Sequence, residues 1–205
     1  VVQDITERKR AEMALQQHVE RLHTMRAIDG VILAAWTAPD TARAVLRHIR
    51  QLIPCQWAAV MTIDADAEAA TLLALSSDLD TPLAVDARIS LEDAAPLADL
   101  QDGKLHLVQD MAALAQPSKM ERQLHAAGVR SYLAVPLIAH GMLVGSLNLG
   151  ATASAGFTAE HVDIASELAG QLAIAIRQAR LFKQVQRHAE ELEQHDIPVN
   201  RLNIQ

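Results

Sequence analysis

Two long amphipathic segments, one near each end of the chain, dominate its pattern of apolar and polar residues. Residues 4–35 contain no proline, and Leu15, Val19 and Leu22 follow one another at the four-three spacing of a coiled-coil stripe. Residues 159–195 also lack proline and would form a helix about 55 Å long. Because a compact domain of ~150 residues is only about 40 Å across, we predict long terminal helices that protrude from the domain.

The apolar stripe of the C-terminal helix shifts along its length. Leu168 and Leu172 belong to a first stripe, which is suited to packing on the helix's own domain. Leu181, Val185 and Leu192 form a second stripe, which we interpret as a contact surface for another chain. Together with the N-terminal stripe it predicts a homodimer through coiled-coil helices, with parallel and antiparallel pairing both open. A solvated tail is the alternative for the end of this helix.

Between the terminal helices, the apolar pattern switches repeatedly between the period of a strand and the period of a helix. A β-hairpin near residue 140 is the clearest element, because two alternating apolar runs flank a short turn that contains glycine. The predicted strands are residues 57–63, 71–76, 105–108, 130–138 and 142–150, and the predicted helices are residues 40–52, near 94–101 and near 118–126.

The two hairpin strands indicate how the domain is layered. The first strand is apolar on both faces, with Leu133 on one face and Tyr132 on the other, which is typical of a sheet covered on both sides. In the second strand, simple alternation places Leu143 on the same face as Leu147. We expect helices on one sheet face and the irregular residues 78–128, here called the roof, on the other. Short pieces roofing a sheet predict a ligand cavity.

Charge and composition narrow the classes of partner. The chain has a net charge of −7, and residues 27–176 hold eight basic and seventeen acidic side chains, so nucleic acid is not an expected partner. No apolar run approaches the ~18 residues of a membrane span, so direct membrane insertion is not expected either. The single cysteine, Cys55, and an N-terminus without a signal pattern favour a cytoplasmic location.

Five segments, in their order along the chain, resemble the GAF domain family over roughly residues 23–182. The matching segments are Leu52–Gln56, Gly128–Leu137, Gly141–Leu149, Phe157–Glu160 and Leu168–Ile176. The resemblance implies an α+β fold with a central, mainly antiparallel sheet of about six strands. In that fold the N- and C-terminal helices lie on one sheet face, and short helices and loops roof a small-molecule pocket on the other.

A second resemblance concerns the N-terminus, where Asp4–Glu12 is similar to the segment that leaves a PAS domain in bacterial signalling proteins. It implies a linker helix over residues 1–22, the GAF sensory domain over 23–182, and an output linker helix with a tail over 183–205. The implied role is a non-catalytic sensory or regulatory domain of a bacterial signal-transduction protein, such as a two-component sensor histidine kinase or a cyclic-dinucleotide enzyme. The alternative is a ligand-free dimerisation or relay module between the PAS and output domains.

The motifs of several known chemistries are missing from the sequence. Bilin-binding GAF domains attach the chromophore at a Cys-His pair, whereas Cys55 precedes Gln56, so a bilin is not expected and Cys55 is interpreted as a buried core residue. Cyclic-nucleotide-binding members carry Asn-Lys where this chain has Asn148 and Leu149, so a cyclic nucleotide is not expected. Histidines at metal-ligand spacing and a catalytic constellation are also missing. The sequence predicts neither a metal site nor an enzyme, and it leaves haem open.

Candidate ligand contacts are the polar and aromatic residues within or beside the roof. They are Tyr132, Arg88, His125, Asp110 and Arg130. An anionic ligand would favour the two arginines. Asp110, which resembles an aspartate in the middle of GAF domains, has the alternative role of capping the helix that follows it. The sequence does not identify the small molecule itself.

Overall fold

The computed structural model describes residues 37–64, 68–94 and 97–195. Its elements in chain order are α2 (Ala38–Leu52), β1 (Trp57–Asp64), β2 (Ala69–Ser77), β3 (Arg88–Ser90), α3 (Leu97–Gln101), β4 (His106–Val108), the short 3₁₀ helix η1 (Met111–Ala113), α4 (Lys119–Ala126), β5 (Ser131–Ala139), β6 (Met142–Ala151) and α5 (Ala159–His195). The predicted N-terminal helix, with Leu15, Val19 and Leu22, lies outside the described residues.

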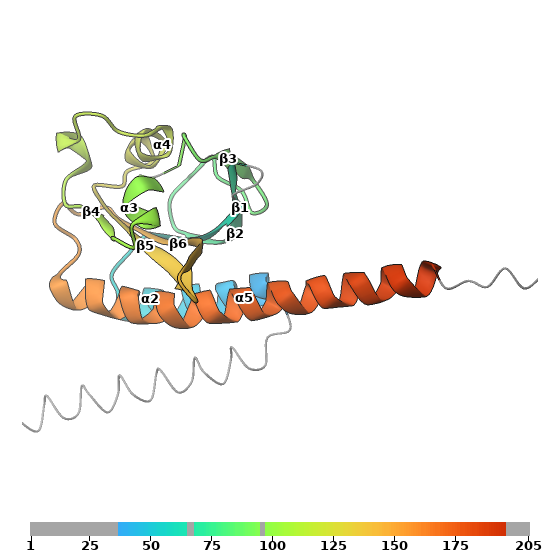
Figure 1. Cartoon of the computed structure of the whole chain (residues 1–205). Coiled ribbons are helices and arrows are strands. Elements are labelled where there is room, and N and C mark those ends of the chain that lie inside the picture. Colours follow the sequence, from blue (N-terminus) through green and yellow to red (C-terminus); the bar gives the residue numbers. More distant parts are fainter. Residues whose placement is uncertain (1–36, 65–67, 95–96, 196–205) are drawn as a thin grey trace, which may run out of the picture.

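The six strands form one antiparallel sheet in the order β3-β2-β1-β6-β5-β4. Helices α2 and α5 lie side by side on one face, while α3, η1 and α4 cover the other, and α5 extends well past the edge of the sheet (Figure 1). This arrangement confirms the predicted α+β fold with a roof of short pieces on the face opposite the long C-terminal helix.

Two hydrophobic cores occupy the two faces of the sheet. The helix-side core packs Leu133 and Leu147 of the sheet against Leu46 of α2 and Leu172 of α5. The roof-side core packs the strands against α3, η1 and α4, and its members include Trp57, Tyr132, Met111, Met120 and Leu124. A strand buried on both faces is what the doubly apolar pattern of β5 predicts.

A bulge in the hairpin corrects one face assignment made from the sequence. Leu137 pairs with Gly145, but the next pair joins Ile138 to Leu143, so β6 contains one extra residue at this point. Because a bulge reverses the alternation of side chains beyond it, Val144 is in the helix-side core and Leu143 packs against the roof-side core. Alternation alone had placed Leu143 with Leu147, which is wrong.

The helix ends follow local sequence signals. Thr37 caps α2, and its hydroxyl oxygen accepts a hydrogen bond from the Asp40 backbone N–H at 3.3 Å. Helix α2 begins two residues before the predicted start, because a proline such as Pro39 is tolerated in the first turn of a helix. Thr158 caps α5, and its hydroxyl oxygen accepts a hydrogen bond from the His161 backbone N–H at 3.3 Å.

Candidate functional site

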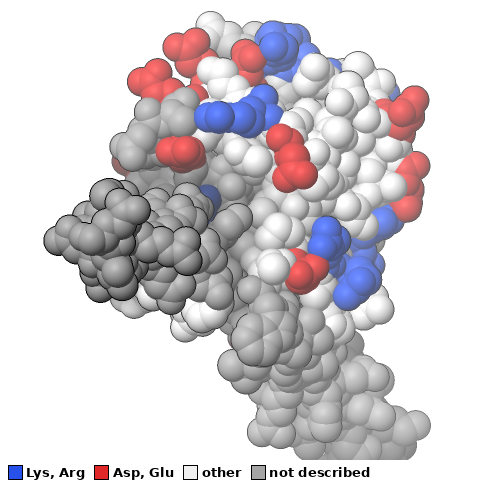
Figure 2. Space-filling model, turned by 90° about the vertical axis from the view of Figure 1, so that its right-hand side faces the viewer, with Lys and Arg blue, Asp and Glu red and all other residues white. Residues whose placement is uncertain are grey.

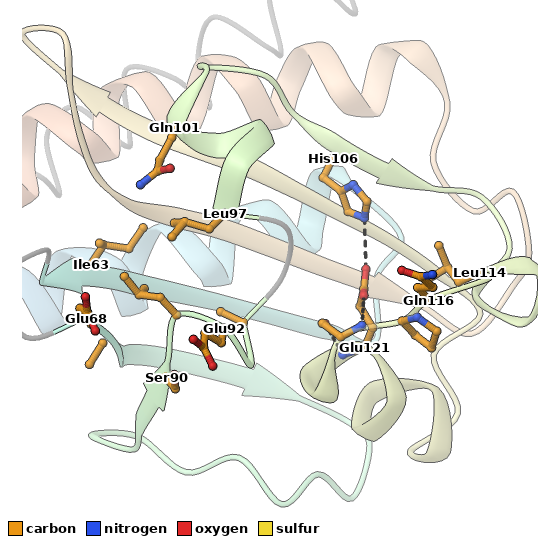
Figure 3. A pocket seen from close by; sticks show the side chains of 15 residues that line it. Ile63, Glu68, Ser90, Glu92, Leu97, Gln101, His106, Leu114, Gln116 and Glu121 are labelled. Atoms are coloured by element: carbon orange, nitrogen blue, oxygen red, sulfur yellow. Dashed lines mark hydrogen bonds and ion pairs between the residues drawn. The ribbon is translucent and has the colours of Figure 1, made fainter.

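A cavity of about 1080 Å³ lies within the roof, on the sheet face opposite α2 and α5. Its wall combines the end of β1, the edge strand β3, helix α3, strand β4 and the start of α4 (Figure 3). Apolar side chains on the wall include Ile63, Leu91, Leu97 and Leu114. A concave site with an apolar lining and a few convergent polar groups is the usual form of a small-molecule pocket.

His106 connects the roof elements that surround the cavity. Its Nε2 donates to Glu121 Oε1 at 3.1 Å (Figure 3). Its Nδ1 lies 3.5 Å from Asp99 Oδ2. The other Glu121 oxygen, Oε2, accepts from the Ser118 backbone N–H at 2.6 Å and completes a capping box at the start of α4. One imidazole therefore joins α3, β4 and α4 at the cavity wall.

Glu121 is almost fully buried, with 3% of its surface exposed. Burial raises the pKa of its carboxyl, but the hydrogen bonds with His106 and Ser118 outweigh burial and hold that pKa below its usual value. The carboxylate is therefore charged at neutral pH and stabilised by its two partners. Glu121 is a structural part of the wall as well as a charged group on it.

A buried polar group lies beneath the cavity. The Tyr132 hydroxyl donates to Asn148 Oδ1 at 2.7 Å, and Asn148 Nδ2 donates to Ser146 Oγ at 2.9 Å. Ser146 and Asn148 line a void of about 10 Å³ that shares Ile63 and Leu97 with the cavity wall. A void of this size holds about one water molecule.

The structure places none of the five predicted ligand contacts among the described residues that line the cavity. Tyr132 is fully buried below His106, with ring centroids 6.3 Å apart. Asp110 Oδ1 accepts from the Ala112 backbone N–H at 3.0 Å, which confirms its alternative role as a cap of η1. The other three are elsewhere: Arg88 is exposed on the edge strand β3, His125 is half-buried on α4, and Arg130 is exposed before β5.

Among the predicted dimer residues, Leu181 is 50% exposed and Val185 is 68% exposed on α5, close to the exposed Phe182. The side chain of Leu192 lies outside the described part of the structure. Both described residues of this stripe are therefore half or more exposed in the single chain, and the role of the stripe in dimerisation stays a prediction.

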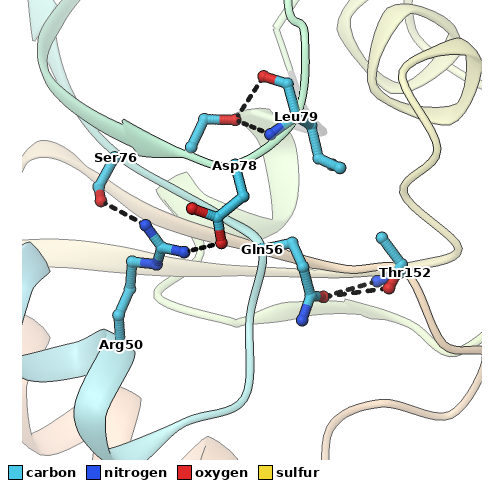
Figure 4. Close-up of polar contacts among 7 residues, drawn as sticks. Arg50, Gln56, Ser76, Asp78, Leu79 and Thr152 are labelled. Atoms are coloured by element: carbon cyan, nitrogen blue, oxygen red, sulfur yellow. Dashed lines mark hydrogen bonds and ion pairs between the residues drawn. The ribbon is translucent and has the colours of Figure 1, made fainter.

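Cys55 is buried between α2 and β1, in the helix-side core. Burial raises the pKa of its thiol to about 11. Nearby, Arg50 donates to Ser76 Oγ at 2.9 Å and pairs with Asp78, and Gln56 accepts from the Thr152 backbone N–H, so polar contacts join the chain around the cysteine (Figure 4). This placement supports the structural interpretation of Cys55.

We expect the Cys55 thiol to resist alkylation in the folded protein, because a thiol with a pKa of about 11 is almost entirely protonated at pH 8. Mass spectrometry after iodoacetamide treatment should show less than about a tenth of the labelling rate measured in 6 M guanidinium chloride. Equal rates in the two conditions would contradict a buried structural thiol.

On the face shown in Figure 2, basic and acidic side chains of the described residues are interspersed, so no patch of a single charge is visible there. Within the described ranges, no three His, Cys, Asp or Glu residues converge as a metal site would require. Among those same residues, no helix combines the length and apolarity needed to cross a bilayer.

Sequence reasoning missed the residues that form the cavity wall, above all His106 and Glu121. The spacing of Ser118 and Glu121 is that of a capping box, and this signal could have placed Glu121 at the start of a roof helix. No comparable local signal marks His106, because its partners Asp99 and Glu121 come from other elements.

An antiparallel sheet with long helices on one face and a roofed cavity on the other defines a class of α+β domains. Residues 38–176 match the sequence profile of the GAF domain, which is more than half of the chain. The chain therefore belongs to the GAF domain family. No curated protein matches it.

Solved structures of GAF domains share the fold. The GAF domain of a phosphoenolpyruvate-protein phosphotransferase from Coxiella burnetii has a TM-score of 0.67 at 18% identity, covering 80% of this chain and 96% of that chain. The phycoerythrobilin-bound GAF domain of a cyanobacterial phytochrome has a TM-score of 0.66 at 20% identity, with coverages of 78% and 96%. The chromophore-binding domain of a bacteriophytochrome from R. palustris has a TM-score of 0.65 at 13% identity, with coverages of 81% and 63%.

At these identities the likeness shows the fold alone. It also bears on the expectation that this chain binds no bilin. Two of the three similar structures are described as bilin-bound or chromophore-binding. The comparison therefore gives that expectation no support.

Proposed function

We propose that this GAF domain is a non-catalytic sensory module that binds a small molecule in the roof cavity and transmits the signal through its terminal helices. The observation that carries the proposal is the cavity of about 1080 Å³ between α3, β4 and α4, with apolar and polar side chains on its wall. In this proposal the domain works within a bacterial signal-transduction protein, downstream of a PAS domain and upstream of an output domain.

The connection around His106 offers a route by which a ligand could change the domain. A molecule in the cavity touches α3, β4 and α4, which His106 already joins. Strand β4 pairs with β5, and β5 packs on α5. The signal requires the ligand to bind one arrangement of these elements more tightly than another, and a coupling of about 1–3 kcal/mol would change output several-fold.

Native mass spectrometry of the chain purified without denaturation tests the proposal. We expect the wild-type chain and an Ala98→Trp control to retain the mass of a small molecule, and Ala94→Trp to lose it. Ala94 lines the cavity, so an indole there fills it, whereas Ala98 is exposed on α3 and is not among the wall residues. Equal retention by both variants would place the ligand elsewhere, and a bare chain in all three samples would favour the relay alternative.

The relay alternative has its own supporting observation. Helix α5 extends past the edge of the sheet (Figure 1). Its residues Leu181, Phe182 and Val185 are each half or more exposed. Exposed apolar residues at this helical spacing suit packing against another helix. A dimerising spacer that binds nothing would need this surface but would not need the cavity.

We expect Leu181→Glu combined with Val185→Glu to convert a dimer into a monomer in sedimentation velocity, because the charges would be desolvated at the helix contact. The matched control is Val85→Glu combined with Met142→Glu, which changes two other exposed apolar residues, 45% and 53% exposed. A dimer that survives the α5 substitutions would show that the contact surface lies elsewhere.

A further inference from the structure

The charged side chains on the cavity wall are acidic apart from one histidine. Glu68, Glu92 and Glu121 line the cavity together with His106 (Figure 3), and no lysine or arginine is among the described residues of the wall. The sequence of the adjoining stretches 65–67 and 95–96 contains no basic residue either. The described wall is therefore acidic, whereas Arg88 and Arg130 would have made it basic and suited to an anionic ligand.

The two outer carboxylates are available to a ligand. Glu68 and Glu92 are exposed, and within the described part of the chain their side chains make no hydrogen bond or ion pair. Lys119, which follows the wall residue Ser118, pairs with Asp93 at 2.9 Å, and Lys104 pairs with Asp102 at 3.0 Å, so neither brings a net positive charge. Asp99, 3.5 Å from His106, adds a further negative charge behind the wall.

The rest of the wall favours an organic molecule. The apolar side chains of Ile63, Leu91, Leu97 and Leu114 line the same cavity, and removing an apolar body from water against them is favourable. The described residues contain no cluster of three His, Cys, Asp or Glu side chains that could hold a metal ion.

We infer that the ligand of this cavity is an organic cation, an amine or guanidine carried on an apolar body. The inference rests on the proposed function, since it names the class of ligand for the same site. An ammonium group near Glu68 and Glu92 is attracted by two carboxylates, whereas a carboxylate or phosphate at the same place is repelled by both. The apolar body then occupies the space beside the leucines.

The test uses three indole probes of similar shape and different charge, namely tryptamine, tryptophol and indole-3-acetate, titrated into the full chain and followed by NMR. We expect tryptamine to bind at least about tenfold more tightly than indole-3-acetate, with tryptophol between them. Raising the salt concentration from 0.05 to 0.5 M should weaken the binding of tryptamine and leave the affinity for tryptophol unchanged. In Ala94→Trp the shifts caused by tryptamine should disappear, because the cavity is filled.

Two double variants with the same change in net charge complete the test. Glu68→Gln combined with Glu92→Gln should lower the affinity for tryptamine by about tenfold and leave the affinity for tryptophol unchanged. Asp80→Asn with Asp163→Asn, at exposed positions away from the cavity, should leave both affinities unchanged. An unchanged tryptamine affinity in the first variant would overturn the inference.

The outcomes separate this inference from the proposed function. If indole-3-acetate or tryptophol binds in the cavity as tightly as tryptamine, the site binds small molecules but the assignment to cations is wrong. If none of the three probes shifts resonances of the cavity wall at millimolar concentration, the inference fails, while the proposed function is decided by the small-molecule mass that wild type and Ala94→Trp retain in native mass spectrometry.

Discussion

Replacing Gly145 with alanine should lower the free energy of unfolding by about 3 kcal/mol, the upper end of the usual cost of overpacking. Gly145 lies in the central strand β6, where it pairs with Thr62 of β1 and Leu137 of β5. A Cβ atom at this position would lie 2.1 Å from the Met61 carbonyl oxygen. Backbone atoms cannot rotate away as a flexible side chain does, so β1 and β6 would have to separate.

The control is Gly170→Ala in α5, where an added Cβ meets nothing within 4 Å. Alanine is favoured over glycine in a helix by about 1 kcal/mol, so this variant should be more stable than wild type. Urea denaturation monitored by circular dichroism measures both changes. Similar midpoints for Gly145→Ala and wild type would show that β1 and β6 do not approach as closely as described.

The second large effect is expected from Glu121→Ala, which should destabilise the domain by about 2 kcal/mol. The substitution removes the hydrogen bonds to His106 Nε2 and to the Ser118 backbone N–H. It also leaves Ser118 without its reciprocal cap and His106 with Asp99 as its remaining acidic partner. Chemical denaturation gives the stability change, and we expect the NMR signals of α3 and α4 to broaden as the roof loosens.

The pH dependence of stability identifies the charge of Glu121 as the cause. Because its pKa is lower in the folded state than the usual glutamate value of about 4.3, its stabilising contribution is fully present above that value. The contribution is lost as the pH falls through the folded-state pKa. The stability difference between wild type and Glu121→Gln should therefore shrink between pH 5 and pH 3.

Glu92→Gln serves as the matched control, since Glu92 is an exposed carboxylate on the same wall with no bonded partner in the described residues. The difference in free energy of unfolding between wild type and Glu92→Gln should stay constant over this pH range. A constant difference for Glu121→Gln between pH 5 and pH 3 would mean that the ionised carboxylate does not stabilise the roof.

The elements of this domain that could be predicted from sequence are those specified by local signals. Two alternating apolar runs around His140 and Gly141 predicted the hairpin, and both turn residues have the positive φ angles that such a tight turn requires. Thr158, a residue type favoured at helix N-caps, follows the apolar Phe157, and this local signal marks the start of α5. Each signal acts over a few residues, so the rest of the fold is not needed to interpret it.

The candidate site could not be predicted in the same way, because its geometry depends on contacts between distant elements. His106 became important through Asp99 and Glu121, which flank it in space from α3 and α4. Arg88 and Arg130 were close to the roof in sequence, but both are exposed and neither lines the cavity. The position of a residue along the chain predicts its neighbourhood but not the wall toward which its side chain points.

The two edges of the sheet affect how copies of this domain can meet. Both edge strands, β3 and β4, are only three residues long. They offer few free backbone donors and acceptors for a strand of another molecule, and natural proteins use such short edges to prevent aggregation by strand pairing. The sheet is thus poorly suited to growing by addition of strands from other molecules, so strand pairing is a disfavoured route of aggregation for this fold.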